Sequence, residues 1–331
     1  MAAEPSIGIE PLSEELVKAY EASGMERGKA GIADIKWTFR SNPQPFAVAR
    51  VGGRIVGVSA YIKNKMLFGN SAGSAVQAVD SFVFEEARGQ RVFSKLATAY
   101  DEFAGNEGID LVWGFPNDNA APAWFGKLGW RKYGQVPFLF KPLRTGFITR
   151  RFGLPTDFRV SRTTDHNIDP VDQIGEWGDV IWEKLARQID VGVVRDRDFL
   201  NHRIFDGPQA SQYRTVLAGP PSDPAFVTSR EAAKHGAKVA YIMEAAGGSS
   251  LRSLLESELG RLTSRGMEVA LAWCYPWSPN YKVYRKAGFF PLPERIRPTS
   301  IWFGSIAKSD VAKSASTLDG WYLSYLDSDT I

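Results

Sequence analysis

The first half of the chain alternates between two kinds of hydrophobic pattern. Apolar residues at helical spacing predict helices over 12–23, 33–39, 92–103 and 119–128. Runs rich in β-branched and aromatic residues predict strands over 46–51, 55–62, 75–84 and 109–115, and one or two strands over 130–140. Gly52-Gly53 joins the first two runs and indicates a hairpin. Strands alternating with helices predict an α/β fold, in which helices flank a central mixed sheet.

The second half repeats this order of elements. Its pattern predicts a strand over 238–243, a helix over 249–263, a strand over 269–274 and a short helix over 280–286. Gly288-Phe289 then matches Gly129-Trp130 of the first half. The repeat favours duplication of one domain, although any α/β chain shows some alternation. We expect domains over 1–145 and 146–306, followed by a Ser- and Asp-rich tail over 307–331 that forms an arm or a frayed end.

Composition narrows the class of protein. A length of 331 residues favours two domains, and 44% hydrophobic with 23% charged residues is typical of globular cores. A net charge of +3 without a dense Lys/Arg run gives no support for a nucleic-acid partner. The single cysteine, Cys274, and the three scattered histidines predict no metal site. No apolar stretch is long enough to cross a bilayer and no signal peptide is evident, so we expect a cytoplasmic protein without a membrane partner.

The turn between the strand over 75–84 and the next helix is the first candidate for chemistry. Glu85-Glu86-Ala87 leaves the strand, and Arg88-Gly89-Gln90-Arg91 leads into the helix. A helix N-terminus exposes unpaired N–H groups and partial positive charge, so such a turn can hold a diphosphate. Gly89 permits close approach of the backbone, and Arg88 and Arg91 add charge.

This turn resembles the central motif of the GNAT superfamily of acyl-CoA-dependent N-acyltransferases, Arg/Gln-x-x-Gly-x-Gly/Ala. The matching residues are Arg88, Gly89, Gln90, Arg91, Val92 and Phe93. Arg91 and Phe93 depart from the pattern, since they replace small residues of the family. The resemblance implies that the amides of Gly89 to Phe93 bind the diphosphate of coenzyme A. It also implies a splayed strand pair whose backbone at Phe82, Val83 and Phe84 holds the pantetheine arm.

A second segment resembles the family's later motif, Asn-x-x-Ala, an aromatic residue and Gly-Phe. Asn117-Asp118-Asn119 precedes Ala121, Phe125 and Gly129-Trp130 in the order of that motif, and the resemblance implies that Asn119 and Phe125 contact coenzyme A. The resemblance covers about 7–140 and implies a tandem protein of two GNAT-like halves. In the second half the turn over 245–250 lacks arginine, so the resemblance implies a degenerate domain without a coenzyme site.

Acyl transfer requires a group that takes a proton from the amine. Asp80, in an otherwise apolar strand, is the first candidate, and Glu85 and Glu86 follow, although the two glutamates fit equally well as solvated loop residues. Many family members use a tyrosine to protonate the leaving thiolate. Phe125 stands at that place here, so Tyr133 or solvent is left for this role.

The acceptor is suggested only by a further resemblance. Segments 199–203 and 321–325 are similar to larger two-half members of the superfamily that are found with polysaccharide and amino-sugar biosynthesis. They imply an amino-sugar as the acceptor. The two coenzyme motifs imply transfer of acetyl, or another acyl group, from acetyl-CoA to a primary amine of a small metabolite, without a metal. A non-catalytic coenzyme A-binding pseudo-enzyme and an aminoacyl-tRNA-dependent transferase are the alternatives. The oligomeric state stays open.

Overall fold

The computed structural model describes residues 4–161, 167–234, 236–297 and 299–328. The chain divides into two compact units, each with its own mixed sheet. Unit 1 holds the described residues up to Gln135 together with Ile301–Leu318, and unit 2 holds Val136–Ser300 and the described chain from Asp319 on. No helix of the described chain is both long and apolar enough to cross a membrane.

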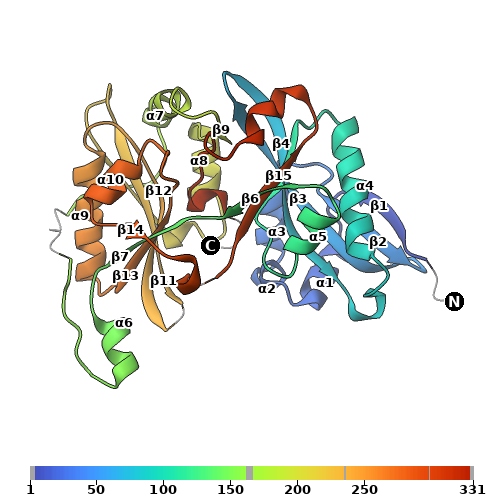
Figure 1. Cartoon of the computed structure of the whole chain (residues 1–331), viewed down its shortest axis with the longest axis horizontal. Helices are drawn as coiled ribbons and strands as arrows, with labels where there is room; N and C mark the ends of the chain where they lie inside the picture. The colour runs from blue at the N-terminus through green and yellow to red at the C-terminus, as the bar shows by residue number, and fades with distance from the viewer. Residues whose placement is uncertain (1–3, 162–166, 235, 298, 329–331) are drawn as a thin grey trace. The chain divides into compact units, whose positions relative to one another are not determined.

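Unit 1 contains the helices that the first half of the sequence predicts and its predicted strands up to Gln135 (Figure 1). The strand Ser6–Glu10 and the helix Glu26–Ala30 were not predicted. Its helices are α1 (Glu14–Ser23), α2 (Glu26–Ala30), α3 (Ile32–Phe39), α4 (Val92–Asn106) and α5 (Ala121–Gly126), with 3₁₀ turns η1 (Glu85–Ala87) and η5 (Asp310–Ser316). Its strands are β1 (Ser6–Glu10), β2 (Phe46–Val51), β3 (Arg54–Phe68), β4 (Ser71–Val83), β5 (Leu111–Gly114), β6 (Arg131–Gln135) and β15 (Trp302–Ala307). The strand order is β1-β2-β3-β4-β5-β15-β6, in which β4 and β5 are parallel.

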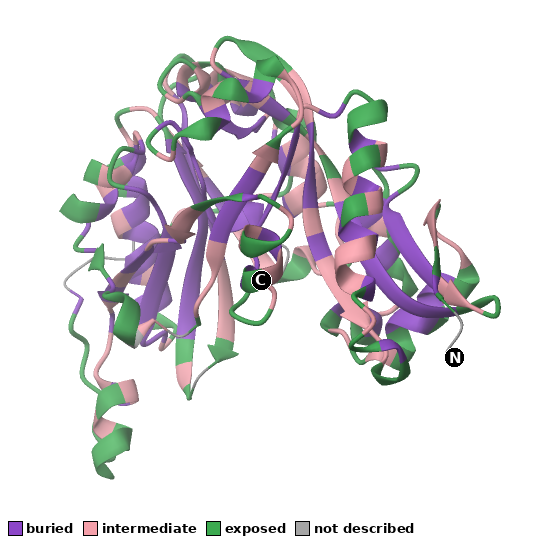
Figure 2. Cartoon of the chain, turned by 45° about the vertical axis from the view of Figure 1, so that its right-hand side comes forward, coloured by how far each residue is buried: buried purple, intermediate pink, exposed green. Residues whose placement is uncertain are grey.

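Helices cover both faces of this sheet. On one face, Leu16 and Tyr20 of α1 and Phe39 of α3 pack against β2 and β3. On the other face, Leu96 and Tyr100 of α4 pack in a second core that also includes α5. Successive residues of β2 therefore belong alternately to the two cores, Phe46 and Val48 to the first and Ala47 and Ala49 to the second. Figure 2 shows much of the central sheet as buried. The two apolar stripes that the sequence predicts for α1 and α4 therefore have their partners on opposite faces.

Unit 2 repeats the arrangement with further helices. Its helices are α6 (Gly146–Thr149), α7 (Trp177–Ala186), α8 (Arg197–Ile204), α9 (Leu251–Ser264) and α10 (Tyr281–Lys286), with 3₁₀ turns η2 (Arg150–Phe152), η3 (Ala210–Gln212), η4 (Glu294–Ile296) and η6 (Tyr325–Asp327). Its strands are β7 (Phe138–Pro142), β8 (Pro170–Val171), β9 (Val191–Val193), β10 (Tyr213–Ala218), β11 (Ala225–Lys234), β12 (Ala237–Gly247), β13 (Val269–Trp273) and β14 (Phe290–Pro291). The sheet order is β14-β7-β13-β12-β11-β10-β8, with β12 and β13 parallel. The leucines of α9 form the core of one face.

Each sheet contains a strand from the other half of the sequence. β7, the last strand of the first half, pairs with β13 and β14 in unit 2. β15, the last strand of the second half, pairs with β5 and β6 in unit 1. The expected ranges 1–145 and 146–306 treat each half as continuous, whereas the compact units exchange these two strands. The hydrophobic pattern of the sequence cannot show the exchange, because β7 and β15 would bury their apolar residues equally well in either sheet.

The expectation of a loose C-terminal arm is wrong for the end of the described tail. Residues 320–328 are all buried in unit 2, and Tyr322 N–H donates to the carbonyl of Val191 at 2.8 Å. Residues 329–331 of the expected tail lie outside the described residues. The Ser- and Asp-rich composition was misleading because its polar groups are hydrogen-bonded internally: Ser324 and Asp327 form a capping box on η6.

The strand exchange predicts a large stability effect at Phe303 of β15. Its side chain is 0% exposed and its ring lies 5.5 Å from Phe115 and 5.0 Å from Tyr133, centroid to centroid. Phe303→Ala should lower the free energy of unfolding by about 3–5 kcal/mol, measured by denaturant titration. The control Phe152→Ala, at a side chain 74% exposed, should cost under about 0.5 kcal/mol. Equal effects would contradict the placement of β15.

Candidate coenzyme and acyl-transfer site

The parallel pair β4–β5 separates at one point in unit 1. Their pairing ends at Ala78 and Gly114, and a Cβ on Gly114 would lie 2.8 Å from the carbonyl oxygen of Ala78, so glycine is required there. Two residues later β4 carries a bulge: Ser59 of β3 pairs with Ser81 and Ala60 with Val79, which leaves Asp80 unpaired at φ 31°. The predicted splay is therefore present, and a β-bulge accompanies it.

Beyond the bulge, β4 has a free edge on the side of β5. Phe84 N–H donates to the carbonyl of Val56 at 2.9 Å, so its main chain faces β3. Because successive residues of a strand direct their N–H and C=O groups to opposite edges, Val83 and Ser81 face the open side. Arg88 Nε donates to the Val83 carbonyl from that side at 3.3 Å. Of the residues expected to hold pantetheine, Val83 therefore directs its N–H to the open edge, and Ser81 is an addition that sequence analysis missed.

The following turn brings backbone amides together at the start of α4. Gly89 has φ 81° and Arg91 has φ 59°, both in the left-handed region. Arg91 thus adopts, at some cost in strain, a conformation that glycine adopts freely, so the family's missing glycine does not prevent the turn. Arg91 is the N-cap of α4 without a side-chain hydrogen bond to the helix amides, and its carbonyl accepts from Lys95 N–H at 3.1 Å. The first amides of the 15-residue helix α4 have no side-chain cap.

Side chains leave this turn open. An added Cβ on Gly89 would have no atom within 4 Å, and Arg88 and Arg91 are exposed. Gln90 bonds back to the Glu86 carbonyl at 3.5 Å. Val92 is buried, and Phe93 turns toward the core, where its ring meets that of Trp124 at 5.4 Å. These residues fit a diphosphate: main-chain donors converge, two arginines flank them, and the bulky side chains point elsewhere.

Asp80 is held by a buried arginine. Arg27 of α2, 8% exposed, donates through Nε to Oδ2 of Asp80 and through Nη1 to Thr38 Oγ1 at 2.8 Å and Asp34 Oδ2 at 3.2 Å. This network ties α2 and α3 to the bulge. The other oxygen of Asp80, Oδ1, receives no hydrogen bond from the described residues. Sequence analysis identified Asp80 but missed Arg27, because an arginine far from the motif carries no local signal.

The structure does not bring the other predicted catalytic residues to the bulge. Glu85 and Glu86 are exposed on η1, and Glu86 pairs with Arg54 at 3.1 Å on the surface. Tyr133 is on β6, which β5 and β15 separate from β4, roughly 14 Å away at ordinary strand spacing. Its hydroxyl donates to the Ala315 carbonyl and lies 2.8 Å from Ser305 Oγ.

Asn119 and Phe125, the two coenzyme A contacts implied by the later motif, take different positions in the structure. Asn119 is exposed, whereas Oδ1 of Asn117 accepts from the N–H groups of Asn119 and Ala120 at 3.1 and 3.0 Å and shapes the turn into α5. Phe125 packs in the core beside Gly304 of β15, where an added Cβ would lie 2.4 Å from its ring. Asn117 is thus the asparagine with the clearer role, and its own Asn-x-x-Ala spacing to Ala120 was the available signal.

Unit 2 repeats the bulge and the splay. Thr228 of β11 pairs with Glu244 and Ser229 with Ile242, which leaves Met243 as the extra residue of β12. The pairing of β12 with β13 ends at Ile242 and Ala272, one residue before the bulge. The two halves therefore share a structural detail that the duplication predicts.

The turn before α9, however, is occupied by the chain's own carboxylate. Oδ2 of Asp223 accepts from both N–H and Oγ of Ser249 at 2.8 Å, and Oδ1 accepts from Lys184 at 2.8 Å. A Cβ on Gly248 would lie 2.2 Å from Asp223. The hydrogen bonds from Lys184 and Ser249 hold the pKa of Asp223 below its usual range. An anion of the protein thus sits where the first half offers free amides.

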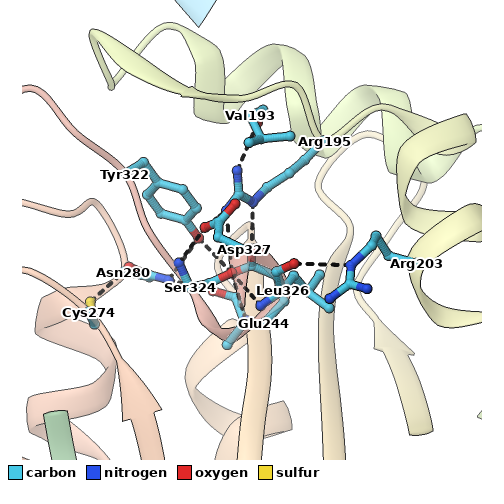
Figure 3. Close-up of polar contacts among 11 residues, drawn as sticks. Val193, Arg195, Arg203, Glu244, Cys274, Asn280, Tyr322, Ser324, Leu326 and Asp327 are labelled. Atoms are coloured by element: carbon cyan, nitrogen blue, oxygen red, sulfur yellow. Dashed lines mark hydrogen bonds and ion pairs between the residues drawn. The ribbon is translucent and has the colours of Figure 1, made fainter. Parts of the chain in front are cut away.

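A buried polar cluster lies beyond the bulge of β12 (Figure 3). Glu244, 0% exposed, accepts from Arg195 at 2.8 Å and from the Tyr322 hydroxyl at 2.6 Å. Burial raises the pKa of Tyr322 well above its usual range, so the hydroxyl stays protonated and donates. Arg195 also pairs with Asp327 of the C-terminal segment. These contacts hold the C-terminus against β12 within unit 2.

Three solved structures of similar fold are two N-acyltransferases and one probable N-acyltransferase. The chain is similar to a GCN5-related N-acetyltransferase from Anabaena variabilis (11% identity, TM-score 0.62, covering 92% of this chain and 73% of that one). It is also similar to Saccharomyces cerevisiae N-myristoyltransferase with bound myristoyl-CoA (11%, 0.59, 92% and 83%) and to a probable N-acyltransferase from Enterococcus faecalis (11%, 0.60, 94% and 74%). No family model and no curated protein sequence matches the chain. The similarities confirm the predicted GNAT fold in a tandem arrangement of two halves.

Asp223→Asn tests the occupied turn of unit 2. A depressed folded pKa means that the carboxylate stabilises the fold above its unfolded value and that this contribution is lost as the pH falls through the folded pKa. We expect a lower Tm than the parent near neutral pH and a difference that shrinks below about pH 4, measured by thermal unfolding across pH. Asp198→Asn, at a carboxylate 94% exposed, is the control and should leave Tm unchanged. A variant with the parent's Tm at neutral pH would contradict the role of Asp223.

Proposed function

We propose that the chain is an acyl-CoA-dependent N-acyltransferase whose first unit alone binds coenzyme A. One observation carries the proposal: the splay of β4 from β5 leads directly into the uncapped amides of α4 through the open turn at Gly89 and Arg91. The free edge of β4 suits an extended pantetheine arm, and the amides suit the diphosphate. Unit 2 shares the bulge, but Asp223 occupies its corresponding turn.

The chemistry follows from the groups around the bulge. The acceptor amine attacks the thioester carbonyl, so a C–N bond forms while the C–S bond breaks and sulfur leaves as a thiolate. The N–H of Val83 or Ser81 on the open edge stabilises the developing oxyanion. Oδ1 of Asp80 takes the amine's proton, while Arg27 orients the carboxylate through Oδ2. Because Phe125 cannot donate and Tyr133 donates to Ala315, the thiolate takes its proton from solvent.

The finer assignment is acetyl transfer to an amino-sugar amine in the cytoplasm. Support comes from the resemblance of segments 199–203 and 321–325 to two-half members of the superfamily. Within unit 2, Arg203 of the first segment donates to the carbonyls of Leu326 and Ser328, which follow the second segment, at 3.1 and 2.8 Å. Since one relative of similar fold binds myristoyl-CoA, assays should compare acetyl-CoA with myristoyl-CoA.

Coenzyme A binding is tested at Gly89. Gly89→Asp places a negative charge beside the diphosphate and a side chain at φ 81°, so the rise in Tm at saturating acetyl-CoA or myristoyl-CoA should disappear. Gly108→Asp is the matched control, since Gly108 also has positive φ, 67°, and open space around its Cβ, but lies beyond the far end of α4. The control should keep the full rise. An unchanged rise in Gly89→Asp would overturn the site.

Catalysis is tested at Asp80. Asp80→Asn should lower kcat by about 100-fold or more, because a general base contributes on that scale, and should keep the Tm rise with acyl-CoA. Glu85→Gln, at an exposed carboxylate, should retain activity within about twofold. The assay is release of free thiol with a panel of amines that includes amino-sugars.

The same assay separates the second candidate, a pseudo-enzyme that binds coenzyme A without turnover. That candidate has a specific observation in its favour, since Asp80 is already ion-paired and Phe125 replaces the family's acid. Binding without thiol release for any amine would establish it. Full activity in Asp80→Asn would instead retain the transferase and remove the proposed base.

A further inference from the structure

A hairpin projects from unit 2 directly after β7. Thr145 N–H donates to the Phe158 carbonyl and Val160 N–H to the Leu143 carbonyl, both at 2.9 Å, and Arg144 and Arg159 form an antiparallel bridge. Helix α6 and turn η2 form its tip, which extends away from the sheet of unit 2 in Figure 1. We name residues 143–160 the apolar hairpin.

The apolar hairpin carries most of the large hydrophobic side chains that the described chain exposes. They are Ile148 (48% exposed), Phe152 (74%), Leu154 (52%), Phe158 (65%) and Val160 (48%). The other strongly exposed ones among the described residues lie on other segments of the chain: Ile32, Trp277, Phe290 and Val311. Figure 2 shows the projecting segment as largely exposed. Such a concentration in one short segment marks an interaction surface.

Hydrogen bonds and ion pairs hold these side chains outward. Asp157 accepts from Arg144 Nε at 2.7 Å and from Gly146 N–H at 3.0 Å, which closes the base of the hairpin. Arg150 of η2 forms a bidentate pair with the buried carboxylate of Glu268 at 2.6 and 2.8 Å. The hairpin is therefore anchored to unit 2, and its exposed apolar residues are presented by ordered structure.

The charge around the hairpin is positive. The hairpin has four arginines, and two carboxylates pair with them, which leaves an excess of two positive charges. The arginines are Arg144, Arg150, Arg151 and Arg159, and the carboxylates are Asp157 and Glu268. Arg151 is exposed directly before Phe152 at the tip. Two copies of the chain meeting through this surface would bring arginines against arginines, which disfavours a symmetric dimer. Apolar side chains beside arginines are instead the composition that binds the surface of an anionic bilayer.

We propose that the apolar hairpin docks unit 2 onto an anionic lipid surface. The five apolar side chains enter the boundary between headgroups and acyl chains, and the arginines meet lipid phosphates. This departs from the sequence-based expectation of no membrane partner, which considered spanning segments. The inference is independent of the proposed transferase activity.

Co-sedimentation with vesicles tests the proposal. The intact protein should bind vesicles of equal parts phosphatidylglycerol and phosphatidylcholine, bind phosphatidylcholine alone at least about tenfold more weakly, and dissociate as salt rises. Phe152→Ser combined with Phe158→Ser should weaken binding by at least about tenfold. Arg151→Glu should weaken binding to the anionic vesicles selectively.

The chain offers matched controls for this experiment. Ile148→Ser with Val160→Ser should weaken binding, whereas Ile32→Ser with Val311→Ser, at residues of the same types and 45% and 46% exposed, should not. All variants should keep the parent's Tm, which shows that they fold. Absence of vesicle binding by the intact protein would overturn the proposal. Equal loss of binding in the Ile148/Val160 and Ile32/Val311 double variants would also overturn it. Dimerisation through the hairpin without lipid binding, detected by sedimentation, would do the same.

Discussion

The separation of two parallel strands is the constraint on which the candidate site depends. β4 and β5 pair only up to Ala78 and Gly114, and the bulge at Asp80 then turns the edge of β4 away from its neighbour. Without that separation, the main chain of Ser81 and Val83 would be used up in sheet hydrogen bonds. The bulge thus leaves main-chain groups of β4 available to form hydrogen bonds with a thioester and its pantetheine arm.

The bulge itself is stabilised by charge. A non-glycine residue at φ 31° is strained, and the strain is offset by the ion pair between Asp80 and the buried guanidinium of Arg27. Since Arg27 also contacts Asp34 and Thr38, the helices before β2 are coupled to the bulge. The Asp80 carboxylate therefore has two roles in our proposal. Its Oδ2 pairs with Arg27 and holds the bulge, and its Oδ1 is left to accept the proton of the amine.

The comparison between the halves explains why a repeated fold yields one site. Both β4 and β12 carry a bulge, and both are followed by a helix with a glycine-containing turn. In unit 2 the turn binds Asp223, and Glu244 after the bulge binds Arg195 and Tyr322 of the same unit. In unit 2 the chain's own side chains therefore bind the groups that unit 1 leaves open, which is consistent with a structural role. The sheet of unit 2 includes β7 from the first half, and β15 from the second half completes the sheet of unit 1.

The sequence by itself determined the α/β class, most elements of the first half and the turn from Arg88 to Phe93, because hydrophobic periodicity and turn chemistry are local properties of the chain. The splay of the strand pair was implied by the family resemblance. The sequence also indicated Asp80, since a carboxylate is conspicuous in an apolar strand. Only the tertiary structure decided that Arg27 holds Asp80, that Tyr133 lies strands away, that Asp223 fills the second turn and that β7 and β15 exchange sheets. Each of these depends on contacts between residues distant in sequence. The sequence alone does not identify such contacts, because several partners could bury or pair the same residue.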